Sequence, residues 1–166
     1  AASDVYKRQL FATSGQDGCI LIRETAGGAV IETIQLGKGW VEHLEWSQDG
    51  ISLAASISKN VHVFDYKGQE KWRSEQHSST ISALAWSRND ELATACYGKV
   101  AFHDVIRNKI KQSLEWKGSL ISMELSADGD IVACGSQDNT VHFWRRSTGE
   151  DSCLLYTSPS PRDLST

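Results

Sequence analysis

Three segments decide the fold: VEHLEWSQDG from Val41, ISALAWSRND from Ile81 and LISMELSADG from Leu120. They are copies of one pattern, and their starts are 40 and 39 residues apart. A run of small and apolar residues follows each copy, namely SLAASIS from Ser52, ELATACY from Glu91 and DIVACGS from Asp130. A partial copy, LFATSGQDG, begins at Leu10. A period close to 40 residues indicates one structural unit that is repeated along the chain.

Each unit is predicted to contain four short strands. After the apolar run comes a third run, in CILIRE, VHVFD, VAFHD and VHFWR, and then a more polar fourth run, in AVIETIQ, EKWRSE and KIKQSLE. Short runs rich in Val, Ile, Ala and aromatic residues, separated by Gly, Asp, Asn and Ser, are typical of strands joined by tight turns. Asp49-Gly50 and Asp128-Gly129 are hairpin signals, because glycine adopts positive φ without steric cost. No segment shows a sustained helical period, so the pattern predicts blades of a β-propeller.

The stretch DIVACGSQDNTVHFWRRSTGE, from Asp130 to Glu150, resembles a WD repeat in its small-residue strand, its aspartate-containing turn and its tryptophan-ended strand. The resemblance extends over Leu10 to Gly149. It implies an all-β fold, a partial β-propeller in which two complete four-stranded antiparallel blades are flanked by two incomplete ones. The expected blades span about residues 10–35, 41–75, 80–115 and 120–152. The first is expected to lack its inner strand and the fourth its outer strand, so these blades cannot close a ring.

The match is incomplete at positions that usually tie a WD blade together. The Trp-Asp pair is replaced by Phe64-Asp65 in one copy and by His103-Asp104 in the next, and the Gly-His signature survives only as His77. No blade is therefore expected to hold the full Asp–His–Ser/Thr–Trp hydrogen-bond network, and packing must contribute more of the stability. The resemblance implies structural roles for six residues, which are Asp17, Trp46, His77, Trp86, Asp138 and Trp144.

The resemblance also implies a partner-binding face. In WD-repeat proteins, partners usually dock on the loops that enter the inner strand and on the loops between the second and third strands. These loops map onto Gln16, Lys38, Trp40, Glu42, Thr80, Ser82, Tyr97, Lys117, Ser119 and Gln137. Tryptophan is over-represented among binding hot spots, so Trp40 is either a contact residue or a residue wedged between the first two blades. Trp116 is expected to replace the structural histidine of its blade by packing.

Both ends of the chain look like translated sequencing adapters. AASDVYKRQ at residues 1–9 and CLLYTSPSPRD from Cys153 back-translate to adapter sequences in the correct orientations. We therefore expect residues 1–9 and 153–166 to be artefacts, and residues 10–152 to be the native insert. The segment CLLYTS, from Cys153 to Ser158, is apolar enough to imitate a strand. We expect a structure to place it beside the fourth blade, because an unpaired sheet edge accepts extended segments.

Composition limits the classes of partner. The formal net charge is −4 and the Lys and Arg residues are scattered, which argues against a nucleic-acid partner. No run approaches the roughly 20 apolar residues of a membrane span. Cys19, Cys96 and Cys134 have no paired spacing and are expected to be reduced thiols of a cytoplasmic or nuclear protein. We expect other proteins as partners, no cofactor, no membrane and no small-molecule substrate.

Motifs for catalysis and metal binding are missing from the sequence. It has no nucleophile elbow, phosphate-binding Gly-Lys-Ser/Thr loop, zinc-protease helix or short His/Cys spacing. His62 and His142 occupy equivalent third-strand positions and are interpreted as surface or interblade histidines. The predicted function is a non-catalytic protein-interaction scaffold. Two alternatives stay open: a nucleic-acid-associated propeller, which would need a basic face, and a propeller enzyme acting at the central channel. For the enzyme, the inner strands offer only Glu42, His43, Glu45 and Glu124.

Overall fold

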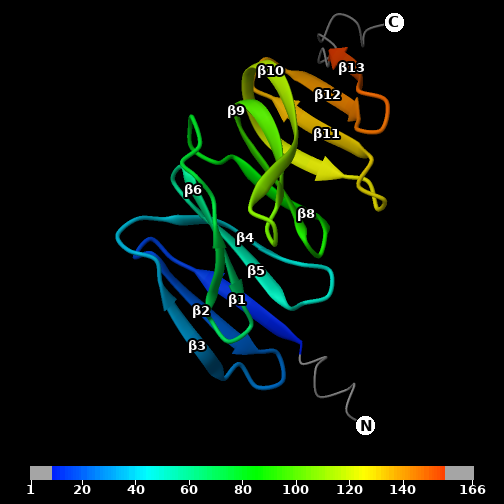
Figure 1. Ribbon diagram of the computed structural model, residues 1–166. Coiled ribbons are helices and arrows are strands. Elements are labelled where there is room, and N and C mark those ends of the chain that lie inside the picture. Colours follow the sequence, from blue (N-terminus) through cyan, green and yellow to red (C-terminus); the bar gives the residue numbers. More distant parts are fainter. Residues whose placement is uncertain (1–8, 156–166) are drawn as a thin grey trace, which may run out of the picture.

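The structure is a computed structural model, and it describes residues 9–155 (Figure 1). The regular elements of this part of the chain are all β-strands. The first seven are β1 (Leu10–Ser14), β2 (Cys19–Glu24), β3 (Val30–Gln35), β4 (Val41–Trp46), β5 (Ser52–Ile57), β6 (Asn60–Asp65) and β7 (Glu70–Arg73). The next six are β8 (Ala83–Arg88), β9 (Glu91–Asp104), β10 (Lys109–Leu125), β11 (Ile131–Ser136), β12 (Thr140–Arg145) and β13 (Glu150–Leu155). None of the described residues forms a helix that is long and apolar enough to cross a membrane.

The first two sheets are antiparallel meanders whose strands pair in chain order. β1, β2 and β3 form a three-stranded sheet, and β4 to β7 form a four-stranded one. Leu10 pairs with Glu24 across β1 and β2, and Ser52 pairs with Asp65 across β5 and β6. The three-stranded sheet is the first blade, which lacks an inner strand here. The four-stranded sheet is the second blade, which is complete.

The third sheet has six strands, in the order β13-β12-β11-β10-β9-β8, and it contains two blades. β9 turns at Gly98, where φ is +73°, and the register of β10 breaks between Glu115 and Ser119. β8 pairs with the first half of β9, and the second half of β9 pairs with the first half of β10. The second half of β10 pairs with β11. The third blade therefore ends within β10, and the fourth blade begins there.

β13 lies beside β12 and gives the fourth blade an outer strand. Its register pairs Glu150 with Arg145 and Leu155 with Thr140. The predicted placement of the segment from Cys153 is confirmed for its first three residues, 153–155. The rest of that segment lies outside the described residues, as do residues 1–8. The fourth blade thus has four strands rather than the expected three, and the adapter origin of the two ends stays a prediction.

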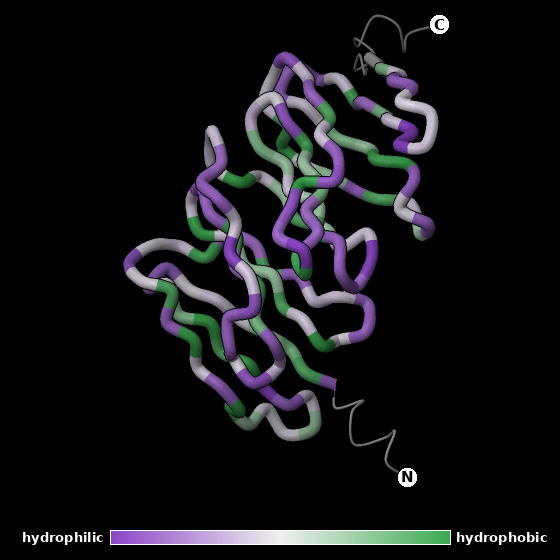
Figure 2. The backbone as a smooth tube through the Cα atoms, in the orientation of Figure 1, coloured by the Kyte–Doolittle hydropathy of each residue, from purple (hydrophilic) through white to green (hydrophobic). Residues whose placement is uncertain are grey.

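The hydrophobic core is divided among the contacts between successive blades. The blades follow one another along the molecule, β3 and β13 lie at its opposite ends, and the described blades close no ring (Figure 1). Figure 2 shows hydrophobic positions along the strands and hydrophilic ones in the turns. The first contact holds Ile20, Ile22, Leu53 and Phe64, the second Val63, Trp72, Leu84 and Trp86, and the third Phe102, Leu120, Val132 and Trp144. This arrangement is a partial β-propeller, as the repeat predicted.

Tryptophan side chains fasten the contacts between blades. Trp86 is 8% exposed, and its indole N–H donates to the Glu45 carbonyl of the preceding blade at 3.0 Å. Trp46 is half-buried and packs against the core between the first two blades. A buried aromatic ring removes a large apolar area from water, so these residues contribute strongly to packing. Cys134 is fully buried, and this burial raises the pKa of its thiol to about 12.

Candidate functional site

One end of the blades is formed by two sets of loops that interleave. Between the first two blades, the β1–β2 loop lies against the β3–β4 loop, and Asp17 forms a β-bridge with Gly39. Gly18 has a φ of +71°, and a Cβ there would lie 2.1 Å from the Gly37 carbonyl oxygen. Only glycine fits such a close approach of two backbones. The loops that carry Gln16 and Trp40 are therefore held together through their backbones.

The same interleaving recurs at the later blade junctions. The N–H of Ile81, in the loop entering the third blade, donates to the Ser58 carbonyl in the β5–β6 turn at 2.9 Å. Tyr97, at the turn within β9, pairs with Ser119 at the entry to the fourth blade. The N–H of Gln137 then donates to the Ser119 carbonyl at 2.9 Å. Backbone hydrogen bonds thus link the loops of neighbouring blades into one continuous surface, which we call the loop face.

The predicted partner-binding residues lie on this face, and most are solvent-exposed. The exposed ones are Gln16, Lys38, Trp40, Glu42, Thr80, Tyr97, Lys117 and Gln137, whereas Ser82 and Ser119 are half-buried. The Ser82 hydroxyl donates to the Ala95 carbonyl at 3.2 Å, so its side chain is engaged within the blade. Trp40 and Tyr97 expose 59% and 61% of their surfaces. The Trp40 ring is therefore not wedged between blades, and the contact interpretation is the one we carry forward.

The third blade holds a chain of three polar side chains in place of the full WD network. Nδ1 of His77 lies 3.1 Å from the Lys59 carbonyl, so this nitrogen carries the hydrogen and Nε2 accepts. Thr94 Oγ1 lies 3.0 Å from Nε2 of both His77 and His103. Its single hydrogen goes to His77, so it accepts from His103. Burial, with smaller effects from His77 and Lys99, lowers the pKa of His103 to about 4, and the ring is neutral at physiological pH.

The fourth blade holds a related chain. Asp138 accepts hydrogen bonds from the backbone N–H and the hydroxyl of Thr140, and that hydroxyl lies 2.7 Å from Nε2 of His142. Trp116 packs on the His142 ring with centroids 3.8 Å apart. His142 and His62 are both buried. Of the two interpretations of these histidines, surface or interblade, burial rules out the surface one and agrees with the interblade one.

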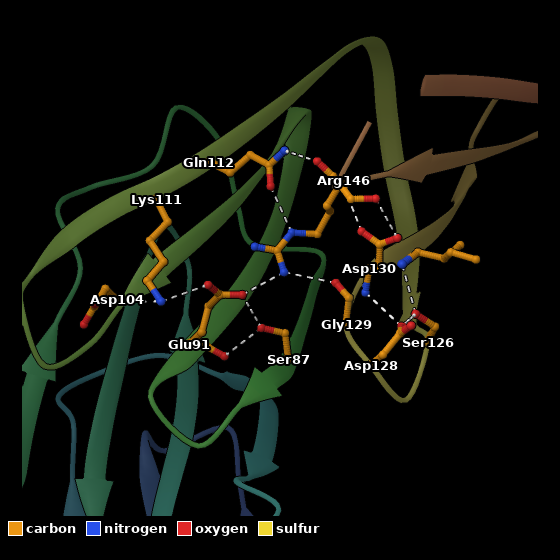
Figure 3. A network of polar contacts seen from close by, with 12 residues as sticks. Ser87, Glu91, Asp104, Lys111, Gln112, Ser126, Asp128, Gly129, Asp130 and Arg146 are labelled. Carbon is orange, nitrogen blue, oxygen red and sulfur yellow. Dashed lines mark hydrogen bonds and ion pairs between the residues drawn. The ribbon is translucent and has the colours of Figure 1, made fainter. Parts of the chain in front are cut away.

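At the opposite end, a charged network joins the third and fourth blades (Figure 3). The Glu91 carboxylate lies 2.8 Å from Arg146 Nη1, 2.5 Å from Ser87 Oγ and 3.3 Å from Lys111 Nζ. The Arg146 guanidinium also lies 3.6 Å from the centroid of the Phe102 ring. Burial by itself would raise the pKa of Glu91, but hydrogen bonds from Arg146 and Ser87 outweigh it and lower that pKa. Glu91 is therefore a buried carboxylate that is ionised and paired.

The central channel and the histidines offer little chemistry. Glu45 on β4 is solvent-exposed, but partial desolvation and then the Glu124 carboxylate on β10 raise its pKa, with His43 acting in the opposite direction. Glu42, the fourth member of this predicted set, is exposed. Within residues 9–155, no group of three or more His, Cys, Asp or Glu side chains is arranged to hold a metal ion. The inner strands bring two carboxylates near each other and nothing more.

Glu91 and Arg146 were not among the residues that sequence reasoning selected. The only signal for Glu91 is a glutamate at the start of an apolar run, and Arg146 sits in an ordinary turn after Trp144. Their partnership depends on how two blades stack, which no local pattern encodes. His103 was likewise seen as a substituted tryptophan position and not as a member of a hydrogen-bonded chain.

Comparison with known proteins agrees with this architecture. The family model described as "WD domain, G-beta repeat" matches residues 109–145, which run from β10 to the end of β12. A chain in the solved structure "Crystal Structure of Mitotic Checkpoint Complex" matches with a TM-score of 0.80 at 18% identity, covering 92% of this chain and 52% of that chain. That likeness establishes the fold alone.

Two relatives share sequence as well. The chain is 30% identical over 135 residues to "Cell division cycle 20.4, cofactor of APC complex" of Arabidopsis thaliana, which covers 77% of this chain and 30% of that protein. It is 29% identical over 162 residues to "U3 small nucleolar RNA-associated protein 18 homolog" of Mus musculus, covering 92% of this chain and 28% of that protein. The chain thus spans less than a third of the length of either relative. Four successive antiparallel blades with a repeat of this kind define a β-propeller, and the chain belongs to the WD-repeat family.

Proposed function

We propose that this chain is a non-catalytic scaffold that binds other proteins through the face formed by its interleaved loops. The exposed rings of Trp40 and Tyr97 carry the proposal. Their loops are fixed by backbone bonds to neighbouring loops, so little conformational entropy is lost when a partner binds. Aromatic side chains on a rigid framework are typical of binding hot spots.

The relatives support a role in assemblies. One is named a cofactor of the APC complex, and another is named as U3 small nucleolar RNA-associated. We extend this to a cytoplasmic or nuclear protein whose partners are other proteins, which suits the free thiols of Cys19, Cys96 and Cys134.

The test compares capture of partners by the intact protein and by the double variant Trp40→Ala/Tyr97→Ala. We expect capture to fall at least about tenfold, because a hot-spot truncation costs about 2 kcal/mol or more, while the melting temperature stays unchanged. Ile106→Ala is the matched control. Ile106 is 77% exposed in the β9–β10 turn, at the opposite end of the blade. If the double variant captures the same proteins in the same amounts, the loop face is not the binding surface.

A second candidate, association with an RNA-containing assembly, is favoured by one observation. The mouse relative is named as U3 small nucleolar RNA-associated, and its similarity covers 92% of this chain. The net charge of −4 argues for contact through protein partners within such an assembly. Direct binding of U3 RNA by the intact protein that weakens steeply with salt would favour RNA contact instead. A propeller enzyme rests only on the raised pKa of Glu45, and we do not favour it.

A further inference from the structure

A groove of about 490 Å³ lies between the outer parts of the second and third blades. It is lined by β7, the β7–β8 loop, the second half of β9 and the start of β10. Its walls are bonded to each other, because the Trp72 indole N–H donates to Asn108 Oδ1 at 2.8 Å. His77, on the loop side, is anchored to the Lys59 carbonyl and to Thr94. The groove is therefore preformed.

Three aromatic rings line this groove. Ring centroids are 5.3 Å apart for Trp72 and His103, and 5.5 Å apart for His77 and His103. The hydrogen-bond chain through Thr94 uses the hydrogen on His103 Nε2. In the neutral ring, Nδ1 of His103 is then a hydrogen-bond acceptor. The groove consequently combines apolar ring surface with an acceptor that suits an N–H donor.

The rim of the groove is cationic although the chain as a whole is acidic. Lys99 and Lys109 line it against one carboxylate, that of Glu75, and the neutral histidines add no charge. Lys71 and Lys111 form ion pairs elsewhere in the molecule. Within residues 9–155, neither Lys99 nor Lys109 has a carboxylate within ion-pair distance. These two ammonium groups are available to an anionic ligand.

We propose that this groove binds an extended acidic segment of a partner protein. Separate Glu or Asp carboxylates of the segment pair with Lys99 and with Lys109, which lie five residues apart along the β9–β10 ladder, and a backbone N–H donates to Nδ1 of His103. The inference rests on the proposed function, that the chain binds proteins. It adds a second surface, on the side of the propeller, with a stated ligand chemistry.

The mixture of groups favours a peptide over a simple anion. One inorganic anion cannot reach both lysines, which the register places about 17 Å apart along the sheet, and it would be repelled by the lone pair of His103 Nδ1. A peptide supplies one carboxylate for each lysine, an N–H for the imidazole and apolar side chains for the rings of Trp72 and His77. The groove volume of about 490 Å³ also exceeds what one small ion fills, and suits several residues of an extended chain.

The test uses a fluorescein-labelled decapeptide in which Glu alternates with Leu, titrated against the intact protein by fluorescence anisotropy. We expect the double variant Lys99→Gln/Lys109→Gln to bind about tenfold more weakly or worse, because hydrogen bonds to charged groups are lost. Lys67→Gln is the matched control, since Lys67 is exposed in the β6–β7 turn and outside the groove. In the unmodified protein, the peptide should also shift the ¹⁵N resonance of His103 Nδ1, assigned with His103→Gln.

Three results would overturn the inference. They are equal binding of a decapeptide with Gln in place of Glu, an unmoved His103 resonance at saturating peptide, and binding only when phosphoserine replaces Glu. The groove inference and the loop-face proposal can be refuted independently of each other. If partner capture depends on Trp40 and Tyr97 but the acidic peptide does not bind, the groove inference is wrong and the proposed function stands. If the peptide binds in the groove but partner capture does not depend on Trp40 and Tyr97, the loop face is not the partner-binding surface.

Discussion

Replacing Arg146 with methionine should destabilise the protein more than any other removal of one surface-accessible charge. Methionine keeps the unbranched apolar stem over the Phe102 ring and removes the guanidinium. Glu91, which is 3% exposed, would retain Ser87 and Lys111 but lose its shortest ion pair, at 2.8 Å. Breaking a buried ion pair by removing one partner costs about 3–5 kcal/mol. Because Lys111 remains, we expect a loss of about 3 kcal/mol, at the lower end of that range.

The assay is urea unfolding of the intact protein, followed by tryptophan fluorescence, in a double-mutant cycle with Glu91→Gln. We expect a coupling energy of about 2 kcal/mol between the two positions, within the range for residues in contact. The pKa of Glu91 is lowered in the folded state, so its contribution is complete above its unfolded pKa and is lost as pH falls through the lowered value. Arg146→Met should therefore remove part of the acid sensitivity of unfolding.

Arg107→Met is the matched control for this prediction. Arg107 lies 3.8 Å from Asp104 with 72% of its side chain exposed, so its guanidinium is solvated, and the buried Asp104 carboxylate keeps the backbone N–H groups of Ile106 and Arg107 as donors. A long pair whose cation is in solvent contributes about 0–1 kcal/mol. The argument for a buried network is refuted if Arg146→Met costs no more than Arg107→Met, or if the effects of Arg146→Met and Glu91→Gln simply add.

Other variants test the packing of the tryptophans, the protonation of His103 and the turn aspartate Asp138. Trp86→Ala should lower the free energy of unfolding by about 3–5 kcal/mol, whereas Trp40→Ala should change it by less than about 0.5 kcal/mol; equal losses in urea unfolding would make Trp40 a packing residue. The folded pKa of His103 is about 4, below an unfolded value of about 6.5, so stability should be complete above pH ~6.5 and decline toward pH ~4. His103→Gln should flatten this profile, and an NMR titration that finds a folded pKa near 6.5 would contradict the assignment. Asp138→Ala should lower the melting temperature by leaving the buried Thr140 N–H without its acceptor, and an unchanged melting temperature would show that solvent replaces the carboxylate.

The blade pattern could be predicted because it depends on local chemistry repeated at a fixed period. The copies that begin at Val41, Ile81 and Leu120 are each rich in apolar residues before a turn, and they lie at the start of β4, directly before β8 and within the second half of β10. Hairpin signals such as Asp49-Gly50 fall in the turns of the structure, where Gly50 has a φ of +70°. Strand order follows from these signals, since a meander needs no information beyond the sequence of turns.

The contacts between blades could not be predicted in the same way. Glu91 and Arg146 meet only when two blades stack, and His103 finds Thr94 only after β9 has folded back on itself. The exposure of Trp40 also depends on the approach of two loops, which the sequence left open between a contact and a wedge. The partner-binding roles of the loop residues stay predictions, because exposure shows what is accessible and not what binds.

The continuous sheet through the third and fourth blades has a consequence for how the molecule comes apart. Hydrogen bonding passes from one blade to the next where Tyr97 pairs with Ser119, whereas the first two blades belong to separate sheets. Repeat proteins usually lose their units one at a time, at the weakest junction. Here the last two blades share a ladder and should open as one cooperative unit in native-state hydrogen exchange, with a single opening free energy, while the first blade exchanges on its own. Under a pulling force applied to the two ends, the third and fourth blades should then unfold last and together. Cleaving the chain within β10 should destabilise both of these blades at once.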